Sequence, residues 1–211
     1  LMIRIVKESK LIYFSFYCLA VGLIGILSSF NINSNDNKTF KIEPIMEITE
    51  LKRISVESSP PRLDTINSHL NLVEVNKIDN SIILDIRYAS KNNFMGSKFY
   101  SEERAFLNRD ASLNLINASK ELKKKGFGIV VYDAYRPWFV SKMFWEGTPD
   151  YLKHFVADPS KGSVHNRGCA IDIGLYNLSD GTLVNMISGY DEFTEKAYPN
   201  YKGGTKYQRE V

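Results

Sequence analysis

One ten-residue segment, S-V-H-N-R-G-C-A-I-D at 163–172, holds the densest group of side chains that could do chemistry. A strand through Asp172 would turn that carboxylate to the same face as two very small neighbours, which leaves room for an ion or a substrate. His165 precedes it by an odd interval of seven residues, and Gly168 permits the bend or bulge that brings the imidazole back toward Asp172. An imidazole and a carboxylate are good zinc ligands. The alternative is a surface histidine beside a turn, with the carboxylate satisfied by a backbone hydrogen bond.

A second segment, Y-D-A-Y-R-P-W at 132–138, places Asp133 and Arg136 where a buried strand is expected to end and a helix to begin. A guanidinium at that position can give a fork of charge-assisted hydrogen bonds to an oxyanion or a carboxylate. The same arginine can instead form an ion pair with an aspartate and so join the strand to the helix. The spacing alone leaves both interpretations open.

The elements that must position these residues follow from the hydrophobic pattern. Asp110 is expected to cap a helix that ends at Gly126, and Pro137 fits the first turn of another helix. Strands are expected over 81–89, 128–134 and 169–176, from alternation in the first and β-branched runs in the second. Because helices and strands do not alternate regularly, we predict an α+β fold with a mostly antiparallel sheet flanked by helices.

The first thirty residues have the composition of a membrane or export segment. Residues 11–30 carry no charge and would span roughly 30 Å as a helix, the thickness of the hydrocarbon layer of a bilayer. Arg4, Lys7 and Lys10 precede them and favour a cytoplasmic N-terminus. A membrane anchor, a cleaved signal peptide and a buried core helix all fit this pattern. The first two predict an exported protein, periplasmic or in the cell envelope, anchored in the inner membrane if the segment is not cleaved.

The sequence divides into three parts. Residues 1–30 form the membrane or signal helix, 31–69 a polar linker, and 70–211 the domain that carries both motifs. The linker is inferred from its polar start and from the Pro pair of SSPPR at 58–62, which no helix interior tolerates.

Composition excludes several classes of protein. With 44% apolar and 24% charged residues, the 211-residue chain can bury a core and is not a disordered protein. Its two cysteines, Cys18 and Cys169, rule out a disulfide scaffold, and Cys169 is expected to pack rather than to bind metal. The formal net charge is +3, most of it in the first thirty residues, so nucleic acid is not an expected partner.

The two motifs together resemble a known family. Y-R-P followed about thirty residues later by S-x-H-x-x-G-x-A-x-D is similar to the zinc D-alanyl-D-alanine dipeptidases of the VanX type. The similarity runs from about residue 70 to 211. It includes LDIRYASKNNFMG at 84–96, LYNLSDGTLVNM at 175–186 and GYDEF at 189–193. The resemblance implies the fold of these peptidases and an enzyme of cell-wall peptide metabolism.

The resemblance also implies roles for individual residues. His165 and Asp172 match two zinc ligands, and a metal-activated water would hydrolyse the D-alanyl-D-alanine dipeptide. Arg136 matches the arginine that stabilises the oxyanion of the transition state. Ser163 would support His165, and Asp191 is a candidate for a role in the substrate pocket. The enzyme would then be a metallo-dipeptidase whose cofactor is Zn²⁺.

The sequence departs from the family pattern after these motifs. The family supplies its third zinc ligand and its catalytic Glu from a later E-x-x-W-x-H stretch, which this sequence does not contain. The three histidines are His69, His154 and His165, and none follows Asp172. We therefore expect the sequence to be a C-terminally truncated piece of such an enzyme, the alternative being a degenerate, non-catalytic relative.

Two other functions remain open. One is a peptidoglycan carboxypeptidase or endopeptidase of the same superfamily, which would act on longer cell-wall peptides. The other is an inactive, membrane-tethered module that uses the surroundings of Arg136 to hold a peptide carboxylate.

Overall fold

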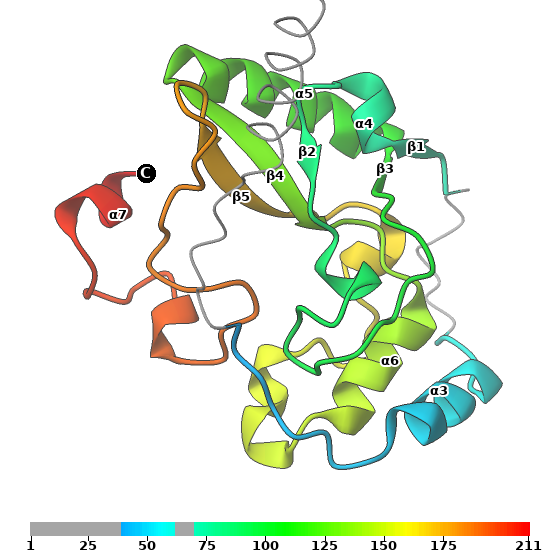
Figure 1. The fold of residues 1–211 in the computed structure, drawn as a ribbon. Helices are drawn as coiled ribbons and strands as arrows, with labels where there is room; N and C mark the ends of the chain where they lie inside the picture. Colours follow the sequence, from blue (N-terminus) through cyan, green and yellow to red (C-terminus); the bar gives the residue numbers. More distant parts are fainter. Residues whose placement is uncertain (1–38, 62–69) are drawn as a thin grey trace, which may run out of the picture. The chain divides into compact units, whose positions relative to one another are not determined.

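The computed structural model describes residues 39–61 and 70–211 (Figure 1). The membrane or signal helix expected at 1–30 lies outside the described residues. Within the described ranges, no helix has both the length and the apolar character needed to cross a bilayer. The segment expected to be a linker contains a helix, α3 (Ile48–Glu57), and its Leu51 is completely buried.

The central sheet has three strands in the order β2 (Ile83–Leu84), β4 (Phe127–Asp133) and β5 (Asp172–Asn177). β4 runs parallel to β2 and antiparallel to β5, so the prediction of a mostly antiparallel sheet is wrong and the sheet is mixed. The parallel pair arises because helix α5 (Arg109–Lys124) carries the chain back along the sheet, and β4 therefore starts at the same end as β2.

The strand expected over 81–89 is much shorter than its hydrophobic pattern suggests. Only β2 pairs with β4, and the chain then turns into a 3-10 helix, η1 (Arg87–Ala89). A separate antiparallel pair joins β1 (Leu72–Glu74) to β3 (Phe106–Asn108), with the short helix α4 (Val75–Ile78) directly after β1.

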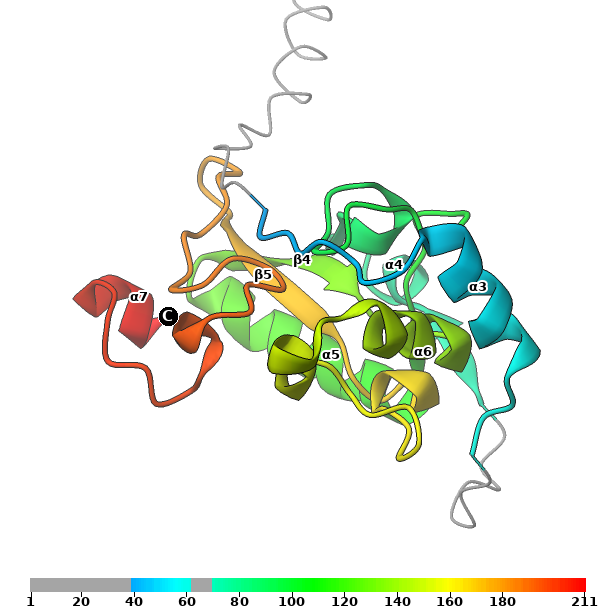
Figure 2. The same ribbon diagram turned by 90° about the horizontal axis from the view of Figure 1, so that it is seen from below.

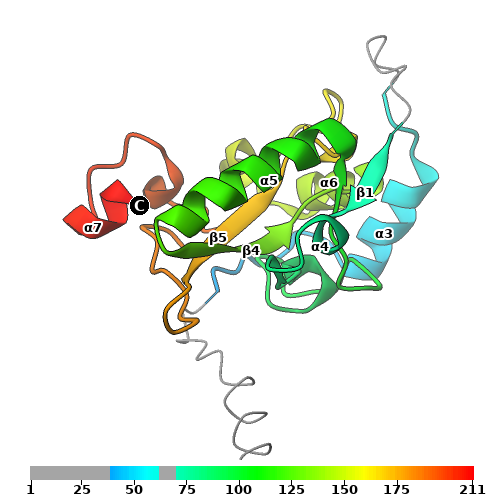
Figure 3. The same cartoon turned by 90° about the horizontal axis from the view of Figure 1, so that it is seen from above.

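Helix α5 covers one face of the central sheet (Figure 3). Its cap is Asn108, whose side chain accepts a hydrogen bond from the backbone N–H of Asp110, so the cap lies two residues before the predicted one. Leu115 of α5 packs with Ile129 and Val131 of β4 in the core between the helix and the sheet. The expected helix and the expected buried strand are therefore packed against each other.

A second core lies between α3 and α6 (Trp138–Gly147), which run side by side (Figure 2). This core is largely aromatic: Tyr88 and Phe144 pack with their ring centroids 4.6 Å apart. Gly147 permits the close approach of the two helices, because a Cβ there would lie 2.8 Å from Leu51 Cδ1. The aromatic core forms one wall of the site described below.

The remaining described elements are short. They are the 3-10 helices η2 (Asp150–Phe155), η3 (His165–Arg167) and η4 (Glu195–Ala197), and the helix α7 (Lys206–Glu210).

Candidate active site

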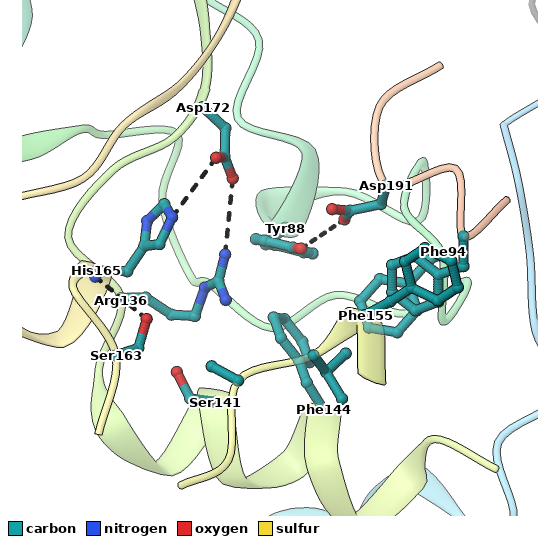
Figure 4. Close-up of a pocket in the computed structure, with 13 residues that line it drawn as sticks. Tyr88, Phe94, Arg136, Ser141, Phe144, Phe155, Ser163, His165, Asp172 and Asp191 are labelled. Carbon is teal, nitrogen blue, oxygen red and sulfur yellow. Dashed lines mark hydrogen bonds and ion pairs between the residues drawn. The ribbon is translucent and has the colours of Figure 1, made fainter. Parts of the chain in front are cut away.

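The two motif segments meet at one end of the β4–β5 pair. Because the strands are antiparallel, the end of β4 lies beside the start of β5, and Asp133 is paired with Asp172 across a register shift. η3 places His165 next to both, and the backbone N–H of Arg136 donates to the His165 carbonyl at 3.1 Å. Residues some thirty positions apart in the sequence thus form one cluster (Figure 4).

The position of His165 depends on Gly168. Gly168 ends η3 with a left-handed backbone, φ 65°, and its N–H donates to the His165 carbonyl at 3.0 Å. A Cβ at this position would lie 2.6 Å from Leu72 Cδ2 and 3.0 Å from the Asn108 backbone nitrogen. Both the conformation and the space therefore require glycine, and the expected bend is a 3-10 turn.

His165 and Asp172 are placed to share a metal ion. His165 Nδ1 lies 2.8 Å from the Ala134 carbonyl oxygen, so Nδ1–H donates to it and Nε2 keeps its lone pair. Nε2 lies 3.5 Å from Asp172 Oδ1. Nitrogen and oxygen ligands of a tetrahedral zinc ion, each about 2.0–2.2 Å from the metal, are about 3.4 Å apart. The donor types and their separation fit a zinc-like ion.

The charges of this pair are coupled. Burial would lower the pKa of His165, but the hydrogen bond to Asp172 raises it above its ordinary value. Burial would raise the pKa of Asp172, but the contact with His165 lowers it. A proton and a metal ion would therefore compete for the space between the same two atoms, so metal affinity should fall as the pH falls.

Asp133 completes a group of three candidate ligands, with one atom from each of Asp133, His165 and Asp172 within 4.8 Å of the others. The orientation of the imidazole separates them, however. Asp133 Oδ2 is 3.7 Å from Nδ1, whereas Asp172 lies at Nε2. The two ring nitrogens point in different directions, and Nδ1 is already used by a backbone carbonyl. The ion would therefore bind His165 and Asp172, and Asp133 lies on the other side of the ring.

Arg136 borders the cavity with only 9% of its surface exposed. Its Nε and Nη2 both lie 2.8 Å from Asp133 Oδ2, and Nη2 is 3.7 Å from Asp172 Oδ2. The guanidinium carbon lies 5.2 Å from the ring centroid of Tyr88 and 5.1 Å from that of Phe144. The structure confirms the ion pair with an aspartate and places the guanidinium at the cavity, and donation to an oxyanion or carboxylate stays a prediction.

An aromatic wall faces this polar cluster across a cavity of about 230 Å³ (Figure 4). Asp191 projects from the aromatic side and accepts a hydrogen bond from the Tyr88 hydroxyl at 2.5 Å. Burial raises the pKa of Asp191 to about 7, although Tyr88 and Arg136 counteract it. Its backbone is left-handed, φ 50°, which is unusual for a residue other than glycine. The wall consists of Phe94, Phe144, Phe155 and Phe193.

Comparison with known proteins gives one family model and several relatives of similar sequence. A family model described as D-ala-D-ala dipeptidase, Peptidase M15, matches residues 68–210.

The chain belongs to this dipeptidase family.

Three relatives are each named D-alanyl-D-alanine dipeptidase. The one from Escherichia coli (strain K12) is 33% identical over 127 residues, which are 60% of this chain and 64% of the relative. The one from Enterococcus faecalis (strain ATCC 700802 / V583) is 29% identical over 140 residues, 56% of this chain and 68% of the relative. The one from Enterococcus faecium is 28% identical over 145 residues, which are 59% of this chain and 70% of the relative. The chain thus spans less than two thirds of the length of the Escherichia coli relative.

The structure brings together most of the residues singled out in this dipeptidase-family sequence. His165, Asp172, Arg136 and Asp191 all line the cavity. Ser163 also lines it, and its Oγ accepts a hydrogen bond from the His165 backbone N–H at 3.2 Å, while a supporting role in the chemistry stays a prediction.

The structure places two further residues named from the sequence on the surface. Cys169 is exposed, so the prediction that it packs is wrong: η3 turns the chain before β5 begins at Asp172, and Cys169 precedes the strand. His154 is exposed, and its ring lies tilted against that of Phe155 with the centroids 4.2 Å apart.

Sequence reasoning missed Tyr88, Tyr100 and Asn166. Tyr88 and Tyr100 donate to Asp191 and Asp133, and Asn166 Nδ2 donates to the Arg136 carbonyl at 2.9 Å. Tyr88 lies in the segment expected to be a strand, where a tyrosine is expected to pack in the core. The sequence did offer a way to find Asn166, because an amide side chain inside the 163–172 motif can form hydrogen bonds that join two chain segments.

Proposed function

We propose that this protein is a metal-dependent hydrolase of the D-alanyl-D-alanine dipeptide. The observation that carries the proposal is the His165–Asp172 pair, with zinc-ligand separation, beside the buried guanidinium of Arg136. The names of the relatives from Escherichia coli and Enterococcus support the same substrate.

The cavity offers complementary contacts to a small zwitterionic dipeptide. The Asp191 carboxylate would pair with the substrate ammonium group, and the aromatic wall would contact the methyl groups. The scissile carbonyl would then lie toward His165, Asp172 and Arg136 on the polar side of the cavity. A volume of about 230 Å³ suits a dipeptide better than a longer stem peptide.

His165 Nε2 and Asp172 Oδ1 would hold the metal, which we propose to be zinc. Such an ion would supply a Lewis acid for the scissile carbonyl and for a water molecule. Arg136 would donate hydrogen bonds to the oxyanion that develops as the amide is attacked, in a site where low exposure strengthens the interaction. The Ala134 carbonyl keeps the His165 proton on Nδ1, so that Nε2 remains a ligand throughout.

We also propose that the protein is exported and acts on cell-wall peptides. This part rests on the charge pattern of residues 1–30, which lie outside the described residues. Fractionation of cells that express the complete gene tests it, and recovery of the protein only in the cytoplasm would contradict it.

The hydrolysis is tested with protein produced from its complete gene. We expect release of D-alanine from D-alanyl-D-alanine, loss of activity after chelation, and recovery when zinc is added. His165→Ala and Asp172→Ala should both lose bound zinc and activity, whereas the exposed His154→Ala should keep both.

The same assay separates the alternative functions. Faster turnover of a pentapeptide stem than of the dipeptide would favour a wall carboxypeptidase or endopeptidase. Binding of the dipeptide without turnover in the presence of zinc would favour an inactive binding module.

A further inference from the structure

Asp133 is a completely buried carboxylate whose two oxygens are both engaged. Oδ2 accepts a hydrogen bond from Nε of Arg136 at 2.8 Å, and Oδ1 accepts one from the Tyr100 hydroxyl at 2.8 Å. Nη2 of Arg136 lies 2.8 Å from the same Oδ2 as an ion-pair contact. Contacts to both oxygens restrict rotation of the carboxylate, and the two contacts from Arg136 restrict the orientation of the guanidinium. Among the hydrogen bonds and ion pairs of the described residues, none uses Nη1 of Arg136.

This arrangement is costly for the fold. Burying a carboxylate and a guanidinium removes both from water, and such a pair is weak evidence for stability. Burial raises the pKa of Asp133, and Arg136 offsets this effect only in part. The aromatic rings of Tyr88 and Phe144 restrict the same guanidinium from its sides. All of these contacts restrict how Arg136 can be oriented at the cavity.

A role for Asp133 as a metal ligand is incompatible with these contacts. Its carboxylate lies toward Nδ1 of His165, whereas Asp172 lies at Nε2. Coordination by Asp133 would also remove the partner of Arg136, which would leave a buried cation without its closest counter-charge.

We propose that Asp133 and Tyr100 are positioning residues that aim the Arg136 guanidinium at the reacting carbonyl, and that Asp133 does not bind the metal. This inference rests on the proposed hydrolysis, because Arg136 can stabilise an oxyanion only if such a reaction occurs.

The test compares Asp133→Asn with a matched control, Asp79→Asn. Asp79 is also a hydrogen-bonded carboxylate, partly exposed, that contacts a cation, but it does not line the cavity. We expect Asp133→Asn to lower kcat by about 10- to 100-fold, as is typical when a supporting residue is removed, with a much smaller change in KM. Its zinc content should stay that of the wild type. Asp79→Asn should leave kcat and zinc content unchanged.

Tyr100→Phe provides a second variant if Asp133→Asn does not fold. It removes one hydroxyl and should lower kcat less than Asp133→Asn, again without loss of zinc. Its control is Tyr176→Phe, which removes a hydroxyl that donates to the Ser81 carbonyl away from the cavity.

A third measurement does not depend on turnover. In protein labelled with ¹⁵N-arginine, the Nε–H of Arg136 should give a resonance protected from exchange with water, because it is buried and hydrogen-bonded. This resonance should persist in Asp79→Asn and lose its protection in Asp133→Asn.

The outcomes separate the two proposals. Loss of zinc in Asp133→Asn, an unchanged kcat, or an equal fall in kcat for Asp79→Asn would overturn the positioning role. If the wild-type protein hydrolyses no dipeptide, the proposed function fails. An unprotected Arg136 Nε–H in the wild type would, by contrast, reject the positioning contact itself.

Discussion

Two carboxylates, the partly exposed Asp79 and the completely buried Asp133, each accept hydrogen bonds from a hydroxyl and contact a cation at different places in the fold. Asp79 follows α4 and accepts hydrogen bonds from Ser119 (2.8 Å) and Lys123 (3.0 Å) of α5, and also from the Ser81 hydroxyl at 2.5 Å. Burial would raise the pKa of Asp79, but Ser81, Ser119 and Lys123 hold it well below its ordinary value. This network joins α4 to α5, and none of its members lines the cavity.

Asp133 has the same kinds of partner, a hydroxyl and a cation, but its pKa is shifted in the opposite direction. Its pKa is raised because burial outweighs the contact with Arg136. Asp79 has three hydroxyl or backbone donors besides its lysine, whereas Asp133 has Tyr100 and the arginine. An ion pair between a carboxylate and a cation can therefore serve either the fold or the site. Asp79 stabilises the packing of two helices, and Asp133 holds a cation at the cavity at some cost in stability.

The strongest effect on activity is expected when the cation of the Asp133 pair is removed. Arg136→Ala should lower kcat/KM for the dipeptide by about 10²- to 10³-fold, the usual effect of losing an oxyanion donor. Lys123→Ala, the matched change at Asp79, should leave kcat/KM unchanged. Steady-state kinetics at constant zinc concentration measure both. Equal losses would abolish the distinction between the two carboxylates.

An intermediate effect is expected on stability when Asp79 is replaced. A carboxyl whose pKa is lowered by folding adds stability above its unfolded value of about 4, and that stability is lost as the pH falls through its folded pKa. Asp79→Asn should therefore lower the free energy of unfolding by about 1–3 kcal/mol at pH 7.

Urea unfolding of wild type and Asp79→Asn at pH 7 and at about pH 3 measures this difference. The difference in the free energy of unfolding between the two proteins should be smaller at the lower pH. If this difference in unfolding free energy became larger on acidification, Asp79 would not be stabilised in its ionised form.

A weaker effect is expected at Asp191, a third carboxylate, which lines the cavity and contacts no cation of the described residues as closely as Asp133 does. Its pKa is raised to about 7 by burial, with Tyr88, Arg136, Asp172 and Asp133 as the other groups that act on it. The carboxyl is therefore half ionised near pH 7 and mostly ionised only at higher pH. If the ionised carboxylate binds the substrate ammonium group, KM should fall about 10-fold between pH 6 and pH 7.5, equivalent to about 1.4 kcal/mol.

Asp191→Asn should raise KM and remove this dependence on pH. Asp150→Asn, at an exposed carboxylate, is the control and should keep the wild-type profile. A wild-type KM that does not change over this range would argue against Asp191 as the ammonium site.

Much of the site could be predicted from the sequence because it lies in two short segments. The pair His165 and Asp172 is separated by seven residues, and Gly168 between them signals the turn that brings them together. Arg136 lies three residues beyond β4, the strand that contains the β-branched run, and the end of a buried strand is where a polar side chain can reach a cavity. Local spacing and backbone stereochemistry account for these predictions.

The fold was predicted less completely. The α+β class and the helices around the sheet follow from hydrophobic periodicity, but the parallel pairing of β2 with β4 joins residues 83–84 to 130–131. No local pattern reports that pairing, since it depends on how α5 packs across the sheet. The expected strand at 81–89 is shortened because the chain turns into η1, which buries Tyr88 in the aromatic core.

The chemistry that is available follows from residue types alone: an imidazole, carboxylates and a guanidinium in motifs that resemble a dipeptidase family. The part that each carboxylate plays follows from the way the chain folds. Asp133 pairs with Tyr100 across 33 residues, and Asp191 with Tyr88 across 103. The burial and partners of a carboxylate set its pKa and its role, and both depend on contacts between segments far apart in the chain.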